Sequence, residues 1–137
     1  MRLAEGATSS HDVAMVSAEE VKGVASSLPR AYEAIVRDRV KFRVGRIVFL
    51  SFTPDETMIG FGYPKQERDE LVAREPEKFL PPLAQDIRYH WVRARLDPLG
   101  PEEMHGLIAD AWRMTVPKKI WAPYYDEHPQ LRDRLSG

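Results

Sequence analysis

The stretch from Val36 to Thr53 constrains the fold more than any other. In its first half, apolar and cationic residues alternate: Val36, Val40, Phe42 and Val44 occupy one set of positions, and Arg37, Arg39, Lys41 and Arg43 the other. Successive side chains of a strand point to opposite faces, so one face is predicted to be buried and the other basic. Gly45-Arg46 then supplies a two-residue turn with glycine first, as a type II′ turn prefers. The pattern predicts a β-hairpin.

The turn also fixes which residues of the two strands face each other. In a regular register Val44 pairs with Ile47 and Phe42 with Phe49, so these side chains point into one core. The same register places three apolar residues of the second strand among the Arg and Lys stems on the other face: Val48, Leu50 and Phe52. The hairpin is therefore predicted to present a basic, partly apolar binding surface.

Composition sets limits on the function of this surface. The chain has 137 residues, of which 43% are hydrophobic and 30% charged, as expected for one globular domain. The formal net charge of −1 argues against a protein that coats nucleic acid by overall charge. The charges are segregated, however. Residues 37–46 contain five cations and one acid, whereas residues 98–112 contain three acids and no Lys or Arg.

Two further absences indicate where such a chain functions. There is no cysteine, which excludes disulfides, thiolate metal sites and cysteine nucleophiles. The longest apolar run, residues 47–52, is too short to span a bilayer, and residues 1–16 lack the apolar segment of a secretory signal. We therefore expect a cytoplasmic protein without membrane contact. We expect a flexible lead-in over 1–16, a domain over 17–120 and a C-terminal tail over 121–137.

Capping and periodicity predict the remaining elements. Ser17 and Glu20 form a capping box before an apolar stripe that ends at Pro29, which predicts a helix. Residues 57–63 alternate as a third strand, and Pro64 opens a short charged helix. Residues 79–83 are predicted to be a loop. A second helix with an apolar stripe begins at Pro101 and is broken by Pro117.

A second basic strand is predicted over residues 90–96. Its apolar face carries Val92, Ala94 and Leu96, and its other face carries Trp91, Arg93 and Arg95. Further cations, Lys118 and Lys119, follow the second helix.

The order of these motifs resembles a known family. The matching segments are Phe42-Arg43-Val44-Gly45 running into Ile47-Val48-Phe49, Trp91-Val92-Arg93 near Leu96-Asp97, and Ala111-Trp112-Arg113 followed by Val116-Pro117-Lys118-Lys119. Over roughly residues 17–120 the chain resembles the MmcQ/YjbR family, small bacterial proteins with a CyaY-like, frataxin-like fold that are described as DNA-binding. The resemblance implies an α+β two-layer sandwich with an antiparallel β-sheet and the N- and C-terminal helices packed on one face. It implies no catalytic site.

Three interpretations of the basic surface remain open. An antiparallel sheet commonly exposes one polar face, so the cations can simply be solvated. Repetition of one sign instead favours an anionic partner, and guanidinium groups bind the phosphates of double-stranded DNA without reading its sequence. The residues predicted to bind nucleic acid are Arg37, Arg39, Lys41, Arg43, Arg46, Arg93, Arg95, Lys118 and Lys119. Of these, the resemblance covers Arg43, Arg46 and Lys118, whereas Arg37, Arg39 and Arg95 follow from pattern alone.

The same surface also suits an acidic or amphipathic protein partner, as in a chaperone-like module, with Val48, Leu50 and Phe52 at its centre. The acidic stretch from Glu102 to Asp110 makes weak self-association compatible with the sequence, so a monomer or weak homo-oligomer is expected. A separate interpretation, which does not depend on the basic surface, is an enzyme with a pocket around Tyr89, His90 and Trp91.

Histidines and aromatic residues provide the other candidate sites. The spacing of His11, His90, His105 and His128 fits no metal site, and no catalytic residue, metal or cofactor is predicted. Five aromatic residues are of the kind that stacks on bases in single-strand binders: Trp91, Trp112, Trp121, Tyr124 and Tyr125. Trp112 lies beside the apolar stripe of its helix and is expected in the core.

Overall fold

The computed structural model describes residues 16–132 of the chain and shows an α+β fold built on one six-stranded antiparallel sheet with the strand order β1-β2-β3-β4-β6-β5. The strands are β1 (Tyr32–Val36), β2 (Arg39–Val44), β3 (Ile47–Phe52), β4 (Met58–Gly62), β5 (Phe79–Leu80) and β6 (Trp91–Arg95). The helices are α2 (Ala18–Ser27), α3 (Lys65–Arg74), the short 3-10 helix η2 (Ala84–Asp86), α4 (Pro101–Arg113), α5 (Lys118–Glu127) and α6 (Pro129–Arg132). The predicted lead-in falls, except for Val16, outside the described residues.

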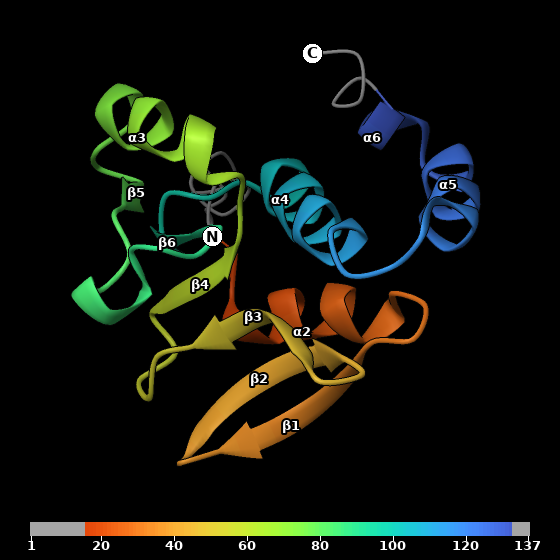
Figure 1. Ribbon diagram of the computed structural model, residues 1–137, viewed down its shortest axis with the longest axis horizontal. Coiled ribbons are helices and arrows are strands. Elements are labelled where there is room, and N and C mark those ends of the chain that lie inside the picture. Colours follow the sequence, from red (N-terminus) through yellow and green to blue (C-terminus); the bar gives the residue numbers. More distant parts are fainter. Residues whose placement is uncertain (1–15, 133–137) are drawn as a thin grey trace, which may run out of the picture.

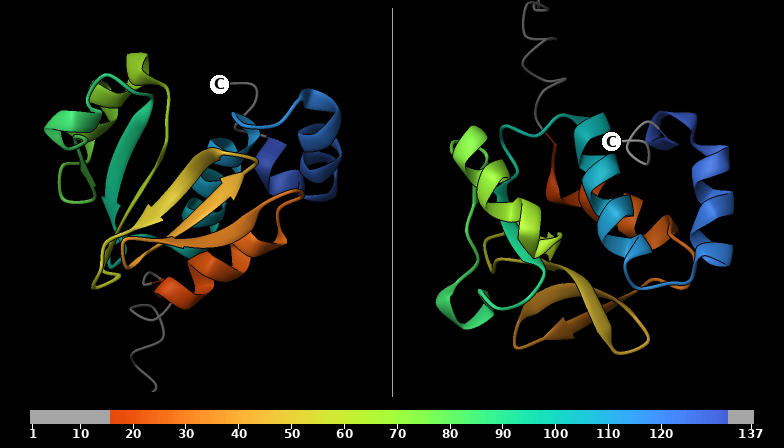
Figure 2. Two further views of the ribbon diagram at one scale, coloured as in Figure 1. Left: turned by 60° about the horizontal axis from the view of Figure 1, so that its bottom comes forward. Right: turned by 45° about the horizontal axis from the view of Figure 1, so that its top comes forward.

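Two helices cover one side of the sheet. Figures 1 and 2 show α2 and α4 side by side there, with α5 beyond α4 and with α3 and β5 at the opposite end of the molecule. The predicted capping box is confirmed at the start of α2, where Ser17 Oγ accepts from the Glu20 amide at 3.1 Å and Glu20 Oε1 accepts from the Ser17 amide at 3.0 Å. The helix ends before Pro29, as expected.

The single strand predicted from Val36 to Val44 is wrong. Arg37 and Asp38 form a two-residue turn between β1 and β2, with φ angles of 53° and 66°. Two consecutive positive φ angles are characteristic of a type I′ turn, which the usual Asn-Gly would have revealed and which Arg-Asp conceals. Because the chain reverses here, Val36 pairs with Arg39 and lies on the basic side of the sheet. Val40 pairs with Ile35 and lies on the other side.

The predicted register between β2 and β3 is correct only next to the turn. Val44 pairs with Ile47, but Phe42 pairs with Leu50 rather than Phe49. Phe49 is the extra residue of a β-bulge, which shifts every later position of β3 by one. As a result Leu50 and Phe52 are buried in the core, and only Val48 of the three apolar residues predicted on the basic face lies there.

Register places one row of large apolar side chains on the helix-facing side of all the central strands. Phe42 pairs with Leu50, Leu50 with Phe61, and Phe61 with Val92, and all four are fully buried. Trp112 of α4 is also buried, as expected, and its indole donates a hydrogen bond of 2.9 Å to the Pro29 carbonyl. This bond joins α4 to the segment that directly follows α2.

The C-terminal residues add to the same core. Residues 121–132, predicted as part of a tail, form most of α5 and all of α6, and Tyr124, Tyr125 and Leu131 are buried. Residues 79–83 are not entirely a loop, since Phe79 and Leu80 form the short edge strand β5 beside β6. Within residues 16–132 no helix has the length and apolar character needed to cross a bilayer.

Candidate nucleic-acid interface

The cations of β2 and β6 lie on the same face of the sheet. Lys41 pairs with Ser51, Ser51 with Gly60, and Gly60 with Arg93, so Lys41 and Arg93 stand in one cross-strand row. The row next to it is the buried one that contains Phe42, so these cations point away from the helices. We call the five cations of these two strands the basic face: Arg39, Lys41, Arg43, Arg93 and Arg95.

Two strands separate the two halves of the basic face. The sheet order places β3 and β4 between β2 and β6. At the usual strand spacing, the cations along β2 therefore lie about 14 Å from those along β6. Ser51, Gly60 and the partly exposed Trp91 occupy the space between them. The basic face therefore carries one line of cations along β2 and another along β6, with a largely uncharged centre between them.

No member of the basic face forms an ion pair with any acid in the described part of the chain. The cations that do so are Lys22, Arg68, Arg74, Lys78, Arg113 and Arg132, all outside it. Arg93 Nε donates to the Pro81 carbonyl at 2.8 Å, and Arg95 Nη1 to the Glu77 carbonyl at 3.1 Å. These bonds orient the two guanidinium groups without neutralising them.

Arg43 is held in a different way. Register places it between Tyr32 of β1 and Val48 of β3, and its Nε is buried without a hydrogen-bond partner in the structure. The stem of the side chain is thus covered by its neighbours. An external ligand does not reach this enclosed nitrogen, so Arg43 can contact a ligand only through the terminal nitrogens of its guanidinium group.

The other predicted cations lie outside the basic face. Arg37 and Arg46 occupy the turns at the two ends of β2, about 20 Å apart for a strand of this length. Lys118 and Lys119 begin α5, in the helix layer. The structure therefore brings Arg39, Lys41, Arg43, Arg93 and Arg95 onto one face, with Arg37 and Arg46 at its margin and the two lysines elsewhere.

Comparison with known proteins identifies the family. The YjbR family model matches residues 26–114, which is more than half of the chain. The chain belongs to the YjbR family. No curated protein matches it.

Two solved structures share the fold of this YjbR protein. A Deinococcus radiodurans protein, DR2400, described as a DUF419 domain, has a TM-score of 0.65 and 17% identity, over 77% of this chain and 86% of that one. A Pseudomonas syringae protein has a TM-score of 0.60 and 18% identity, over 74% of this chain and 100% of that one. At these identities the likeness establishes the fold only.

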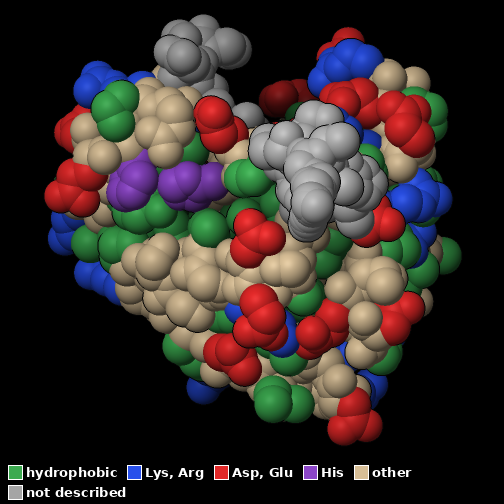
Figure 3. Space-filling view, turned by 180° about the vertical axis from the view of Figure 1, so that it is seen from behind, with side chains coloured by type: hydrophobic (Ala, Val, Ile, Leu, Met, Phe, Trp, Pro, Cys, Tyr) green, Lys and Arg blue, Asp and Glu red, His purple; other side chains and the backbone are tan. Residues whose placement is uncertain are grey.

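The helix side of this YjbR domain carries several acidic side chains. Figure 3 shows acidic side chains across the middle of that side, with two histidines next to each other and most of the visible Lys and Arg toward the rim. An open cavity of about 580 Å³ between α2, α4 and α5 is lined by Glu20, Glu102, His105 and His128, among others. The segregation of charge predicted from the sequence thus separates the sheet face from the helix side.

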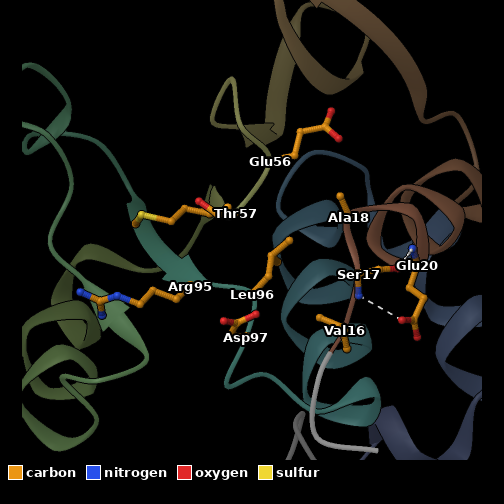
Figure 4. Close-up of a pocket in the computed structure, with 10 residues that line it drawn as sticks. Val16, Ser17, Ala18, Glu20, Glu56, Thr57, Arg95, Leu96 and Asp97 are labelled. Carbon is orange, nitrogen blue, oxygen red and sulfur yellow. Dashed lines mark hydrogen bonds between the residues drawn. The ribbon is translucent and has the colours of Figure 1, made fainter. Parts of the chain in front are cut away.

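A second open cavity, of about 530 Å³, lies where the start of α2 meets the ends of β4 and β6. In Figure 4 the Arg95 side chain extends away from Glu20 and Glu56, which line the same cavity. Both acids already have partners, because Glu20 closes the capping box and Glu56 accepts from Lys22 Nζ at 2.8 Å. Neither of these acids therefore pairs with Arg95, which remains part of the basic face.

The aromatic residues predicted to stack are mostly unavailable. Trp112, Tyr124 and Tyr125 are buried, and Trp121 packs against Tyr125 in the helix layer, with ring centroids 5.4 Å apart. Trp91 is the member of that set on the basic face. It stands next to Tyr89, which is half exposed, and the exposed His90, whose Nδ1 accepts from the Lys65 amide at 2.9 Å.

The described residues contain no group of three or more His, Asp or Glu side chains arranged to hold a metal. His11 lies outside them. His105 is partly buried instead, and its Nε2 is hydrogen-bonded to Tyr124 Oη at 2.8 Å while its ring lies edge-on to His128 at 5.3 Å. Burial, and then the charge of His128, lowers the pKa of His105 below its ordinary value of 6.5.

This pKa shift predicts a loss of stability in acid. The unfolded chain protonates His105 near pH 6.5, whereas the folded chain resists protonation, so the free energy of unfolding falls as the pH drops below about 6.5. His105→Gln, which retains a hydrogen-bonding group for Tyr124, should lose less stability between pH 7.5 and pH 5.5 than the wild type. Urea denaturation at the two pH values measures this difference. An equal loss in both proteins would show that His105 does not cause the acid sensitivity.

Arg68 is the important residue that the sequence analysis missed. It is 5% exposed on α3, and its guanidinium donates to three carbonyls, at 3.0 Å to Ile87, 3.0 Å to Tyr89 and 3.2 Å to Trp91. The available signal was its spacing, since Arg68 precedes the buried Leu71 by three residues and so shares its helix face. Arg68 fixes the backbone that leads into the Trp91 end of the basic face.

Proposed function

We propose that this YjbR-family protein is a small cytoplasmic DNA-binding module that contacts phosphates through its basic face. The observation that carries the proposal is that the cations of β2 and β6 share one solvent-facing side of the sheet and have no acidic partner among the described residues. Unneutralised cations in this density repel one another, and an anionic ligand relieves that repulsion.

The geometry favours phosphate over a protein surface as the anion. Guanidinium groups bind phosphate oxygens through two parallel hydrogen bonds, and Arg39, Arg43, Arg93 and Arg95 supply four of them. The acidic-protein alternative depended on an apolar centre formed by Val48, Leu50 and Phe52. Burial of Leu50 and Phe52 removes that centre, so the remaining face is cationic and polar.

Salt dependence tests the proposal directly. If the five cations of the basic face each contact a phosphate, the logarithm of the affinity will fall with the logarithm of the salt concentration with a slope of roughly −4 to −5. Fluorescence anisotropy with a labelled duplex and with its separated single strand gives the slope for each form. A slope near zero for both forms would rule out phosphate binding by this face.

Charge reversal localises the site. The double variant Arg39→Glu, Lys41→Glu should weaken binding by at least about tenfold, because it removes two phosphate contacts and adds two repulsions. The matched control is Lys118→Glu, Lys119→Glu, which makes the same change of net charge in the helix layer and should alter binding by no more than about threefold. Equal losses in the two variants would show that overall charge, rather than the basic face, attracts the DNA.

A further inference from the structure

Trp91 differs from the other two tryptophans in its surroundings. Trp112 is buried, and Trp121 lies in the helix layer with the Arg113 guanidinium 5.1 Å from its ring. Trp91 lies on the basic face, next to Arg93 along β6, and its indole ring lies over Gly60 of β4, on the side of β6 toward β2. It is partly exposed, so some of its ring is open to a ligand.

Trp91 is constrained both at its ring and at its backbone. A Cβ atom built on Gly60 would lie 2.6 Å from Trp91 Nε1 and 3.0 Å from its Cε2, so the ring occupies the space of a side chain at position 60. The Trp91 carbonyl accepts a hydrogen bond from buried Arg68. Glycine on β4 and arginine on α3 thus fix the ring and its backbone, and little conformational entropy remains to be lost when a ligand stacks on it.

We infer that the basic face binds single-stranded DNA, with Trp91 stacking on one unpaired base while the β2 and β6 cations hold the phosphates on either side. This inference rests on the proposed function and specifies its substrate. Single-strand binders combine a cationic groove with aromatic side chains on which bases stack. In a duplex the base faces are covered by their neighbours, so a ring on the sheet surface meets only groove edges and the backbone.

Intrinsic fluorescence reports on the stacking. Titration of the full-length protein with an oligothymidylate of about 16 nucleotides should quench part of its tryptophan fluorescence. The quenching should persist in Trp121→Phe and disappear in Trp91→Phe, which keeps an aromatic ring to support the fold. Quenching that persists in Trp91→Phe, or its absence from the wild type while the oligonucleotide binds, would overturn the inference.

Affinity distinguishes stacking from simple charge attraction. Trp91→Ala should bind the oligothymidylate about tenfold more weakly than the wild type and a duplex with less than about twofold change. Gly60→Ala should act in the same direction, because its new methyl group displaces the indole without a change of charge. Gly62→Ala is the matched control, since a Cβ there meets Ala111 and Met114 at an ordinary 3.6 Å. Thermal melting of each variant verifies that it is folded.

The outcomes separate the two proposals. If neither form of DNA binds with a salt-dependent affinity, the proposed function fails and the inference fails with it. If both forms bind equally and the Trp91 and Gly60 variants behave like the wild type, the inference is wrong while the phosphate-binding function stands. Preferential loss of single-strand binding in both variants supports the inference.

Discussion

Replacement of Arg68 by methionine should lower the free energy of unfolding by about 3 kcal/mol, because three partly buried carbonyls lose their donor at about 1 kcal/mol each. These carbonyls belong to Ile87, Tyr89 and Trp91, in a segment that otherwise has little regular structure. Methionine preserves most of the apolar stem, so the loss reports on the hydrogen bonds rather than on packing. Urea denaturation measures it.

Two opposing effects decide whether replacement of Arg68 raises or lowers the free energy of unfolding. Burying a guanidinium is costly, and Arg68 Nε has no hydrogen-bond partner in the structure, so removal of the charge recovers some free energy. Against this, the carbonyls converge on the guanidinium from alternate residues of one segment, and no donor replaces it in the methionine variant. We expect the second effect to be larger, because the substitution leaves three carbonyls without their donor but removes only one unpaired donor.

A graded series and a control make this prediction specific. Arg68→Lys should fall between wild type and Arg68→Met, because one ammonium group cannot reproduce the planar fork that spans three carbonyls. Arg74→Met changes the same residue type on the same helix where the side chain is 58% exposed, and should cost less than about 0.5 kcal/mol. If Arg68→Met is as stable as Arg74→Met, the three hydrogen bonds do not stabilise the fold.

The second large effect follows from the bulge at Phe49. Leu50→Ala should cost about 3 kcal/mol, because Leu50 is fully buried against Phe42 and Phe61 and its truncation leaves a cavity. Val48→Ala should cost less than about 1 kcal/mol, because Val48 lies on the partly exposed basic side opposite Arg43. Thermal or chemical denaturation of the pair measures the difference.

The two β3 variants also distinguish the registers of the hairpin. The regular register predicted from sequence places Val48 and Leu50 on the same exposed face, so both substitutions would be mild. With the bulge, only the Val48 substitution is mild. Comparable small losses in the two variants would therefore contradict the bulge and return Leu50 to the surface. Val48→Ala also leaves the cations unchanged, so its DNA affinity should match that of the wild type.

Much of the fold followed from local patterns. The capping box at Ser17 and Glu20 set the start of α2, and the alternation in Trp91–Arg95 separated its cations from Val92 and Ala94. The order of the motifs indicated the YjbR family, which the family model confirms. These predictions were correct because each depends on neighbours within a few residues.

The errors arose where the local signal was weak or misleading. Arg37-Asp38 forms a turn with two positive φ angles but contains neither the glycine nor the asparagine that such turns favour. The apolar and cationic alternation on both sides of it therefore predicts one continuous strand. The bulge at Phe49 has no signal either, since an apolar residue fits both the regular and the bulged register. Arg68 looked like one more charge on a polar helix.

The sequence alone determined that the chain forms an α+β domain with two basic strands and an acidic helix that begins at Pro101. It did so because strand and helix periodicities are properties of neighbouring residues. Only the tertiary structure decided that the two basic strands share one face, that Leu50 and Phe52 belong to the core, and that Trp91 lies on Gly60. Those facts depend on strand order and register, which are set by long-range pairing and by packing of the whole core rather than by any one segment.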